Sequence, residues 1–245
     1  MPKIKTKIIA TIGPATLNYR VFQAMLKEGI DFIRINTSYG SHKQYDQILD
    51  NLKRADHKKK IRVILDIKNL KALSYAKANN IKHIALSFAE NTKQIETVRK
   101  ALPGCFVISK IETRIGVKNF EKILEASDGI MIARGDLSYA VSLENVPPLQ
   151  KDFTYRSLDK KKFVITATEM LLSMVNNSKP TRAEVSDVAN AVFDGSNAVM
   201  LSEETTIGKH PVAVVRIMRK IIAEAEKWGK KMTSARLLNR QCALK

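Results

Sequence analysis

Eight short runs of mostly apolar, often β-branched residues recur along this chain, and each is separated from the next by enough residues for one helix. Near-continuous apolar runs of this kind predict parallel strands buried on both faces and joined by helical crossovers. Eight such units in 245 residues fit a single-domain (β/α)8 barrel better than an open, doubly wound sheet. The predicted strands are Lys7–Gly13, Phe32–Ser38, Arg62–Lys68, His83–Phe88, Phe106–Glu112, Gly129–Arg134, Phe163–Glu169 and Asn197–Glu203.

Helix signals occur between these runs. Thr181 can cap a first helical turn, and Glu184, three residues later, can reach back to it, so the sequence predicts a helix over Arg182–Phe193. A second helix is expected over Pro211–Trp228, because proline suits a first turn and Gly229 follows as a stop signal.

The expected domain organisation is one barrel over residues 1–228 and a basic C-terminal tail over 229–245. The tail carries little periodicity and has no partner element. About fourteen residues separate the third predicted strand from the fourth, which is enough for one helix and too few for an inserted domain.

Composition narrows the class of protein. Lys and Arg number 42 against 24 Asp and Glu, and the net charge of +18 can attract phosphates, nucleic acid or an anionic surface. The two cysteines, Cys105 and Cys242, lie far apart, so neither a disulfide framework nor a Cys-rich metal site is expected and a cytoplasmic location fits best. No apolar run approaches the ~20 residues that cross a bilayer, which argues against a membrane protein.

Polar residues end the predicted strands, at the rim where (β/α)8 barrels carry their chemistry. Cationic and anionic groups should therefore converge there. They include Arg34, Asn36 and Ser38 at the end of strand two, Asp66 at the end of strand three, Lys110 and Glu112 at the end of strand five, Arg134 and Asp136 at the end of strand six, and Thr168 at the end of strand seven.

Lys110 and Glu112 alternate along one strand, so their side chains should point to the same side. Two interpretations are open: both charges form part of a site, or both clear the end of the strand and are solvated. Asp136 favours a site, because two carboxylates around an open position suit a hard cation such as Mg²⁺. The four histidines show no metal-ligand spacing and are expected at the surface or in helix caps.

Two basic clusters, His57–Lys60 and Asp159–Lys162, precede strands three and seven. They belong to the opposite, N-terminal rim of the barrel, so they cannot steer substrate directly into the site. Either they are a solvated, solubilising surface, or they form a docking face for RNA or an acidic protein.

Several motifs together resemble the central barrel domain of the pyruvate kinase family, in the family's order and over roughly residues 5–228. They are Lys7–Ala15, Arg34–Ser38, Leu65–Asp66, Ile108–Glu112, Asp128–Leu137, Pro180–Glu184 and Asp187–Gly195.

The resemblance implies roles for individual residues. Glu112 and Asp136 would hold Mg²⁺ or Mn²⁺, and Lys110 would stabilise the enolate formed when phosphoenolpyruvate gives up its phosphoryl group. Arg34 would bind the phosphate of that substrate. Thr168 and the backbone of Gly135 would also face the substrate, while Asn36, Ser38, Asp66 and the carbonyl of Ile67 would match the family's K⁺ site.

The chain also departs from the family pattern. The mobile lid that members insert after strand three, with its preceding Lys-Gly-Pro-Glu-Ile-Arg segment, is missing, and the C-terminal regulatory domain is expected to be missing too. Tyr39 stands in place of a nucleotide-contacting histidine, Ile207 in place of a lysine, Glu203 in place of a glycine, and Ser138–Ala140 in place of Gly-Ile-Glu. These losses lie on the nucleotide side, so we expect weak binding of ADP and ATP.

The resemblance therefore predicts a pyruvate kinase-like transferase of glycolysis that acts on phosphoenolpyruvate and pyruvate, with phosphoryl transfer to ADP impaired. A lyase, decarboxylase or enolisation catalyst on 2-oxo acids would use the same residues without ADP or a lid. A non-catalytic metabolite-binding or regulatory protein is the third reading. The oligomeric state, a homo-oligomer included, stays open.

Overall fold

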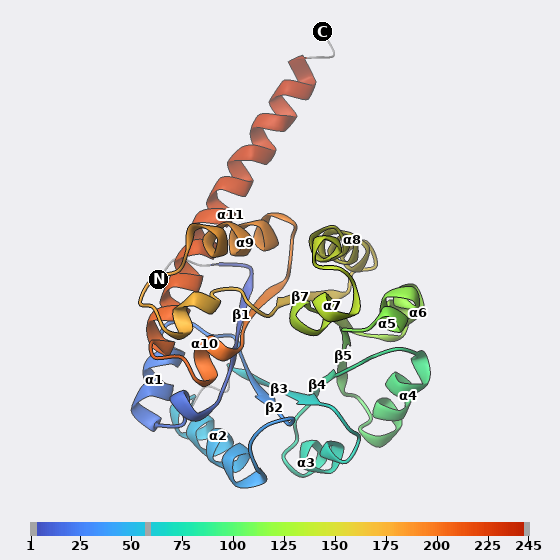
Figure 1. Ribbon diagram of the computed structural model, residues 1–245, viewed down its shortest axis with the longest axis vertical. Helices are drawn as coiled ribbons and strands as arrows, with labels where there is room; N and C mark the ends of the chain where they lie inside the picture. Colours follow the sequence, from blue (N-terminus) through green and yellow to red (C-terminus); the bar gives the residue numbers. More distant parts are fainter. Residues whose placement is uncertain (1–3, 57–59, 243–245) are drawn as a thin grey trace.

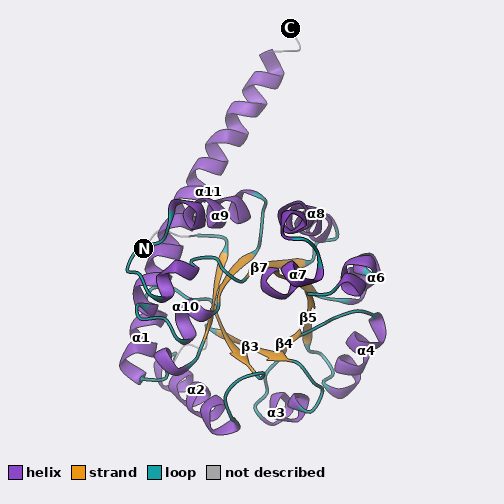
Figure 2. Ribbon diagram, in the orientation of Figure 1, coloured by secondary structure: helices purple, strands orange, loops and turns teal. Residues whose placement is uncertain are grey.

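The computed structural model describes residues 4–56 and 60–242, with 230–242 as backbone only. Eight parallel strands form a closed barrel in chain order, as the sequence predicts, with helices around its outside (Figure 2). The strands are β1 Lys7–Thr11, β2 Phe32–Asn36, β3 Arg62–Ile67, β4 His83–Leu86, β5 Phe106–Ile111, β6 Gly129–Ala133, β7 Phe163–Ala167 and β8 Ala198–Leu201.

The register brings the polar ends of neighbouring strands side by side. Asn36 on β2 pairs with Asp66 on β3, and Asp66 in turn lies opposite Ala85 on β4. On the other side of β4, Leu86 is the partner of Ser109 on β5, so Ser87 and Lys110 follow at adjacent levels. The residues that end these strands consequently converge at one rim.

Both faces of the strands are buried. Ten buried residues fill the barrel interior, among them Ile9, Ile64, Ile108 and Met131, while a larger cluster lies between the strands and the helices. This double burial explains why the strands read as continuous apolar runs rather than as alternating patterns.

Helices alternate with the strands around the barrel (Figure 1). Side-chain caps start several of them: Asn18 caps α1, Asn91 caps α4, and Thr181 with Glu184 forms a capping box on α9. The α-helices are α1 Tyr19–Lys27, α2 His42–Ala55, α3 Ala72–Ala78, α4 Thr92–Ala101, α5 Arg114–Lys118, α6 Phe120–Ala126, α7 Arg134–Ala140, α8 Val146–Asp159, α9 Arg182–Phe193, α10 Glu203–Thr206 and α11 Pro211–Cys242. The 3-10 helices are η1 Pro14–Thr16, η2 Leu143–Asn145 and η3 Leu172–Val175.

The connection from β3 to β4 is fully described and contains α3 as its only helix. It runs from Lys68 to Lys82, and α3 packs its Leu73, Tyr75 and Ala76 side chains into the molecule. The expectation of a single helix without an inserted domain is confirmed here.

Element ends show where the sequence pattern was misleading. Every predicted strand runs one or two residues too far at its C-terminal end, because the polar residues there already turn into the loops. Thr168 and Glu169, for example, were expected in a strand but adopt left-handed backbone angles, with φ values of 73° and 55°. The helix predicted over Arg182–Phe193 is confirmed.

The last helix is longer than predicted. We expected it to stop at Gly229, but α11 continues through this glycine to Cys242. A single glycine costs a helix only about 1 kcal/mol, and no proline follows it to break the hydrogen-bond ladder. The end of α11 points away from the barrel (Figure 1).

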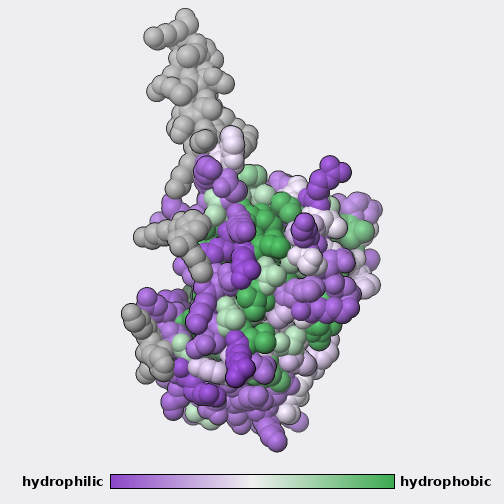
Figure 3. Space-filling model, turned by 90° about the vertical axis from the view of Figure 1, so that its left-hand side faces the viewer, coloured by the Kyte–Doolittle hydropathy of each residue, from purple (hydrophilic) through white to green (hydrophobic). Residues whose placement is uncertain are grey.

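The outer surface is mixed in character. Seen from the side that carries α1 and α11, it is largely hydrophilic, with apolar residues gathered near its middle (Figure 3). In the part of the chain that the structure describes, no helix combines the length and the apolar character that crossing a bilayer requires.

Candidate functional site

Asp66 is the centre of a buried polar cluster at the C-terminal rim. Its Oδ2 atom lies 2.8 Å from both Nε and Nη2 of Arg34, and its Oδ1 atom accepts a hydrogen bond from Ser87 Oγ at 3.0 Å. Lys110 Nζ lies 3.2 Å from each carboxylate oxygen. Burial alone would raise the pKa of Asp66, but the charges and hydrogen bonds of Arg34 and Lys110 hold it below its usual range.

Lys110 connects this carboxylate to a second one. Its ammonium also contacts Ser87 Oγ at 3.1 Å and Glu112 Oε1 at 2.9 Å, while the residue is only 7% exposed. Both side chains therefore point to the same side, as the alternation predicted. The interpretation in which Lys110 and Glu112 are solvated at the strand end is wrong.

Glu112 is 2% exposed and has one unsatisfied oxygen. Its Oε2 atom accepts the backbone N–H of Phe88 at 2.7 Å, whereas Oε1 lies near the Lys110 ammonium without receiving an aligned hydrogen bond. Burial raises the pKa of this carboxyl, and the Lys110 charge counteracts the rise. Glu112 Oε1 is thus a buried acceptor that an additional cation or donor could satisfy.

Arg34 is 6% exposed and is held from three strands. Besides its bonds to Asp66, its Nη1 donates to Thr11 Oγ1 at 3.0 Å, and Thr11 Oγ1 donates to the Leu201 carbonyl at 2.8 Å. The two cations Arg34 and Lys110 match the two carboxylates Asp66 and Glu112, so the buried cluster carries no net formal charge.

A pocket of about 370 Å³ opens beside Arg34, at the ends of β1, β2 and β8. Tyr39, Glu203 and Ile207, three departures from the family pattern, all line it. Tyr39 and Ile207 are 76% and 59% exposed. Since Arg34 is paired with Asp66, this pocket offers no unpaired cation for a polyphosphate.

Arg134 is the centre of a second cluster of polar contacts, in the loops that follow β6 and β7. Its guanidinium donates to the carbonyls of Ala167 and Thr168, the shortest bond being 2.6 Å from Nη2 to Thr168 O, and pairs with Asp187 at 2.7 Å. The Thr168 side chain packs against Gly135, where an added Cβ would lie 2.9 Å from Thr168 Cγ2. Gly135 and Thr168, both predicted to face substrate, are therefore neighbours.

The two predicted metal ligands come from adjacent strands but differ in environment. Glu112 follows β5, which pairs with β6 through Ile111 and Ile132, whereas Asp136 is exposed in the first turn of α7. No group of three or more His, Cys, Asp or Glu side chains in the described residues is arranged to hold a metal ion. Mg²⁺ often takes one or two carboxylates and completes its shell with water and substrate oxygens, so the unsatisfied Glu112 Oε1 fits such an ion.

The residues predicted for K⁺ meet only in part. Asn36 and Asp66 are neighbours in the sheet, and Asn36 Oδ1 accepts the Ser38 N–H at 3.1 Å. The Asp66 carboxylate is already surrounded by Arg34, Lys110 and Ser87, and Ile67 is buried in the core. This arrangement does not fit a further cation at Asp66.

Sequence reasoning missed Ser87, Thr11 and the bond from Arg134 to Asp187. A signal existed for Ser87, because it is a polar residue directly after the buried strand β4. Glu204 was expected among the polar residues that end strand eight, but its contacts were not predicted: this buried carboxylate accepts the N–H groups of Leu171 and Ser202 and so holds the β7 and β8 loops together.

The comparisons with known proteins agree on one family. The family model described as pyruvate kinase, barrel domain, matches residues 3–71 and 64–215. A pyruvate kinase of Chlamydia pneumoniae is 51% identical over 165 residues, which cover 65% of this chain and 34% of that protein. Pyruvate kinases of Methanocaldococcus jannaschii and Thermotoga maritima are 42% and 44% identical over 66% and 61% of this chain, and over 37% and 33% of their own lengths. The chain thus spans about a third of the length of these relatives.

Proposed function

The chain belongs to the pyruvate kinase family through its barrel domain, and on this premise we propose that it is a pyruvate kinase-like, Mg²⁺-dependent enzyme acting on phosphoenolpyruvate and pyruvate. The observation that carries the proposal is the Lys110 ammonium, buried at the C-terminal rim between Asp66 and Glu112. Such an expensive arrangement is not needed to stabilise a barrel, since apolar residues of similar volume would do so at least as well.

The proposed reaction uses this ammonium to stabilise negative charge. When the phosphorus–oxygen bond of phosphoenolpyruvate breaks, its electron pair stays on the enolate oxygen, and a proton then adds to the methylene carbon to give pyruvate. Lys110 would stabilise the enolate oxygen. Arg34 would bind the phosphoryl group, before it passes to ADP, through the guanidinium N–H groups that Asp66 and Thr11 do not use. Gly135 and Thr168 would contact the rest of the substrate.

Glu112 and Asp136 would hold Mg²⁺ or Mn²⁺, which when bound supplies positive charge beside the enolate and phosphoryl oxygens. The K⁺ site of the family would need Asp66 to give up contacts to Lys110 or Arg34. We assign no step to K⁺ in this chain.

Two observations suggest that transfer to ADP is slow. The β3–β4 connection carries no domain that could close over the site and exclude water. The pocket beside Arg34 lacks an unpaired cation and exposes Tyr39 and Ile207 instead.

These two observations favour a second candidate function, enolisation of pyruvate or a related 2-oxo acid. In that reaction a C–H bond of the methyl group breaks, the proton passes to solvent water, and the electron pair of the bond enters the enolate, whose oxygen Lys110 would again stabilise. Neither ADP nor a lid is required. Both functions place the chain among the cytoplasmic enzymes of central metabolism, which suits the free, buried thiol of Cys105.

Two assays on the same protein separate the candidates. The first couples pyruvate formation from phosphoenolpyruvate and ADP to an indicator enzyme, and the second follows deuterium exchange at the methyl group of pyruvate by NMR. We expect exchange to exceed transfer, and both to be lost in Lys110→Met but kept in Lys118→Met, a matched change at an exposed lysine on α5. If the protein binds phosphoenolpyruvate but shows neither phosphoryl transfer nor proton exchange, the proposal is contradicted and the chain is a binding protein.

A further inference from the structure

The acidic residues of the N-terminal rim are largely occupied by partners of the protein itself. Asp31 binds Lys7 Nζ at 2.8 Å, Asp128 binds Arg99 at 2.9 Å, and Asp194 binds Lys151 at 2.6 Å. Asp56 accepts the Ile61 N–H, and Glu226 accepts the N–H groups of Lys5 and Thr6. The charges of Asp31, Asp128 and Asp194 are therefore balanced by these cations, whereas Asp56 and Glu226 are held by backbone N–H groups and keep their negative charge.

Cations of the same rim remain without acidic partners. Lys60 and Arg62 stand at the start of β3, Lys82 precedes β4, Lys161 lies before β7, and Lys5 precedes β1. All five are exposed, and none pairs with a carboxylate in the described part of the chain. Of the cluster predicted at His57–Lys60, residues 57–59 lie outside the described residues.

The barrel mouth inside this ring of cations is closed by aromatic side chains. Phe32, His83, Phe106 and Phe163 follow one another in a closed circuit, with ring centroids 5.4 to 6.3 Å apart. His83 was expected at the surface, but it is half-buried in this circuit, and burial followed by the charge of Arg62 lowers its pKa. A positively charged ring thus surrounds a neutral, aromatic floor.

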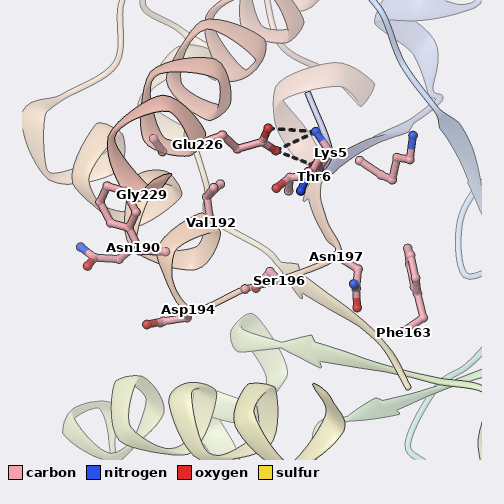
Figure 4. A pocket seen from close by; sticks show the side chains of 14 residues that line it. Lys5, Thr6, Phe163, Asn190, Val192, Asp194, Ser196, Asn197, Glu226 and Gly229 are labelled. Atoms are coloured by element: carbon pink, nitrogen blue, oxygen red, sulfur yellow. Dashed lines mark hydrogen bonds between the residues drawn. The ribbon is translucent and has the colours of Figure 1, made fainter. Parts of the chain in front are cut away.

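A pocket of about 840 Å³ opens at one side of this floor (Figure 4). It is lined by Lys5 and Lys7, by the half-buried Phe163 ring, and by Phe193, which is 47% exposed. The amide side chains of Asn190 and Asn197 also line it. Two carboxylates line it as well: Asp194 is paired with Lys151, and Glu226 accepts the backbone N–H groups of Lys5 and Thr6. Lys7 is paired with Asp31, so the pocket offers the Lys5 cation, aromatic faces and amide groups beside these two carboxylates.

We propose that the N-terminal rim binds single-stranded RNA, with phosphates on Lys5, Lys60, Lys82 and Lys161 and a base in the pocket beside Phe163. Phosphates prefer unpaired cations, and unpaired bases stack on aromatic rings. The amides of Asn190 and Asn197 can bond to base edges and to the ribose 2′-hydroxyl. An acidic protein would use the cations but would gain little from the aromatic pocket.

Salt and charge reversal test the phosphate contacts, with a fluorescein-labelled oligouridylate as the probe. For single strands the logarithm of the binding constant falls with the logarithm of salt by about 0.7 for each neutralised phosphate. Combining Lys60→Glu, Lys82→Glu and Lys161→Glu should reduce this slope by about 2 and abolish binding above roughly 200 mM salt.

A matched variant controls for net charge. Lys43→Glu, Lys71→Glu and Lys93→Glu together change the charge by the same amount, but they lie at the beginnings of α2, α3 and α4, on the other rim. We expect this variant to keep most of the affinity and the full salt slope. Equal losses in both variants would overturn the proposal, because they would reflect net charge and not the N-terminal rim.

Tryptophan fluorescence and substitution of Phe193 test the proposed contact between an RNA base and the pocket. Trp228 is the one tryptophan of the chain, is 53% exposed, and precedes Gly229, which lines the pocket. RNA should therefore change its fluorescence, and Phe193→Ala should weaken binding about tenfold while leaving the salt slope unchanged. Because Phe193 is half-exposed, its truncation should not unfold the protein, and Phe163→Leu gives a second, conservative test.

Two further results would also overturn the proposal. One is the absence of RNA binding at low salt. The other is binding of polyglutamate as tight as that of the oligouridylate, with neither affinity changed by Phe193→Ala, which would assign the surface to acidic proteins. Loss of either kinase or exchange activity bears only on the C-terminal rim, so failure of the proposed function is distinguishable from failure here.

Discussion

Lys110→Met should destabilise the protein in a way that depends on pH. The substitution removes the ammonium that lies 2.9 Å from Glu112 and 3.2 Å from Asp66. Asp66 keeps Arg34 and Ser87, whereas Glu112 keeps only the Phe88 N–H. The cost therefore falls on Glu112, and removing one partner of a buried ion pair costs about 3–5 kcal/mol.

Protonation of Glu112 is the way to avoid this cost. Burial raises its pKa in the intact protein, and Lys110 is the principal charge that opposes the rise, so the pKa should increase further in the variant. A carboxyl whose pKa is raised by folding does not lower the free energy of unfolding at pH values below its unfolded pKa of about 4.3. Between that pH and the raised pKa of the folded protein, it lowers the free energy of unfolding by about 1.4 kcal/mol for each pH unit. The difference in free energy of unfolding between intact protein and variant should thus be larger at about pH 8 than at about pH 5.

Urea unfolding at these two pH values measures the difference. The double variant Lys110→Met with Glu112→Gln serves as the control, because it removes both charges and should recover most of the lost stability at the higher pH. A pH-independent loss, or a double variant no more stable than Lys110→Met, would refute the conclusion that the Lys110 charge stabilises the ionised form of Glu112.

Four further outcomes are expected. Glu112→Gln or Asp136→Asn should remove Mn²⁺ binding in calorimetry, because each takes away one of the two carboxylates proposed for the metal; unchanged affinity in both would dismiss the site. Ile207→Lys should strengthen ADP binding by roughly tenfold, because it adds an unpaired cation worth on the order of 1–2 kcal/mol to the pocket beside the buried cluster. Arg134→Lys should lower kcat more than it raises KM, since one ammonium cannot replace three or more guanidinium contacts that hold the β7 loop. Because the pKa of Asp66 is lowered, its contribution to stability is complete above about pH 4 and is lost as pH falls through the lowered value, so Asp66→Asn should flatten the acid limb of the stability curve.

The fold was predictable because each strand and several helix starts of the barrel have a recognisable local sequence pattern. Each strand is buried on both faces and therefore appears as an apolar run, and the box formed by Thr181 and Glu184 marks the start of α9. The ends of elements were less predictable, since they depend on backbone angles and neighbours. Thr168 looks like a strand residue but turns away with φ of 73°, and Gly229 looks like a stop but lies within α11.

The site was predictable where it depends on one strand. The alternation of Lys110 and Glu112 fixes the direction of both side chains, and the structure places their charged atoms 2.9 Å apart. Contacts between strands were not predictable, because register across the barrel is set by packing and turns far from the site. The resemblance assigned Asp66 to the family's K⁺ site, and its contacts to Arg34 and Lys110 were not predicted.

The exposed cations of the N-terminal rim lie on a different face of the barrel from the residues proposed for catalysis. At the C-terminal rim each buried or half-buried cation has a carboxylate: Arg34 has Asp66, Lys110 has Glu112, and Arg134 has Asp187. A low-dielectric site requires this balance, since an unpaired buried charge costs several kcal/mol. At the N-terminal rim Lys5, Lys60, Lys82 and Lys161 are exposed and solvated, so they lack carboxylate partners at little cost. The excess of +18 therefore says nothing about catalysis, and its effects should appear first at the face opposite the proposed active site.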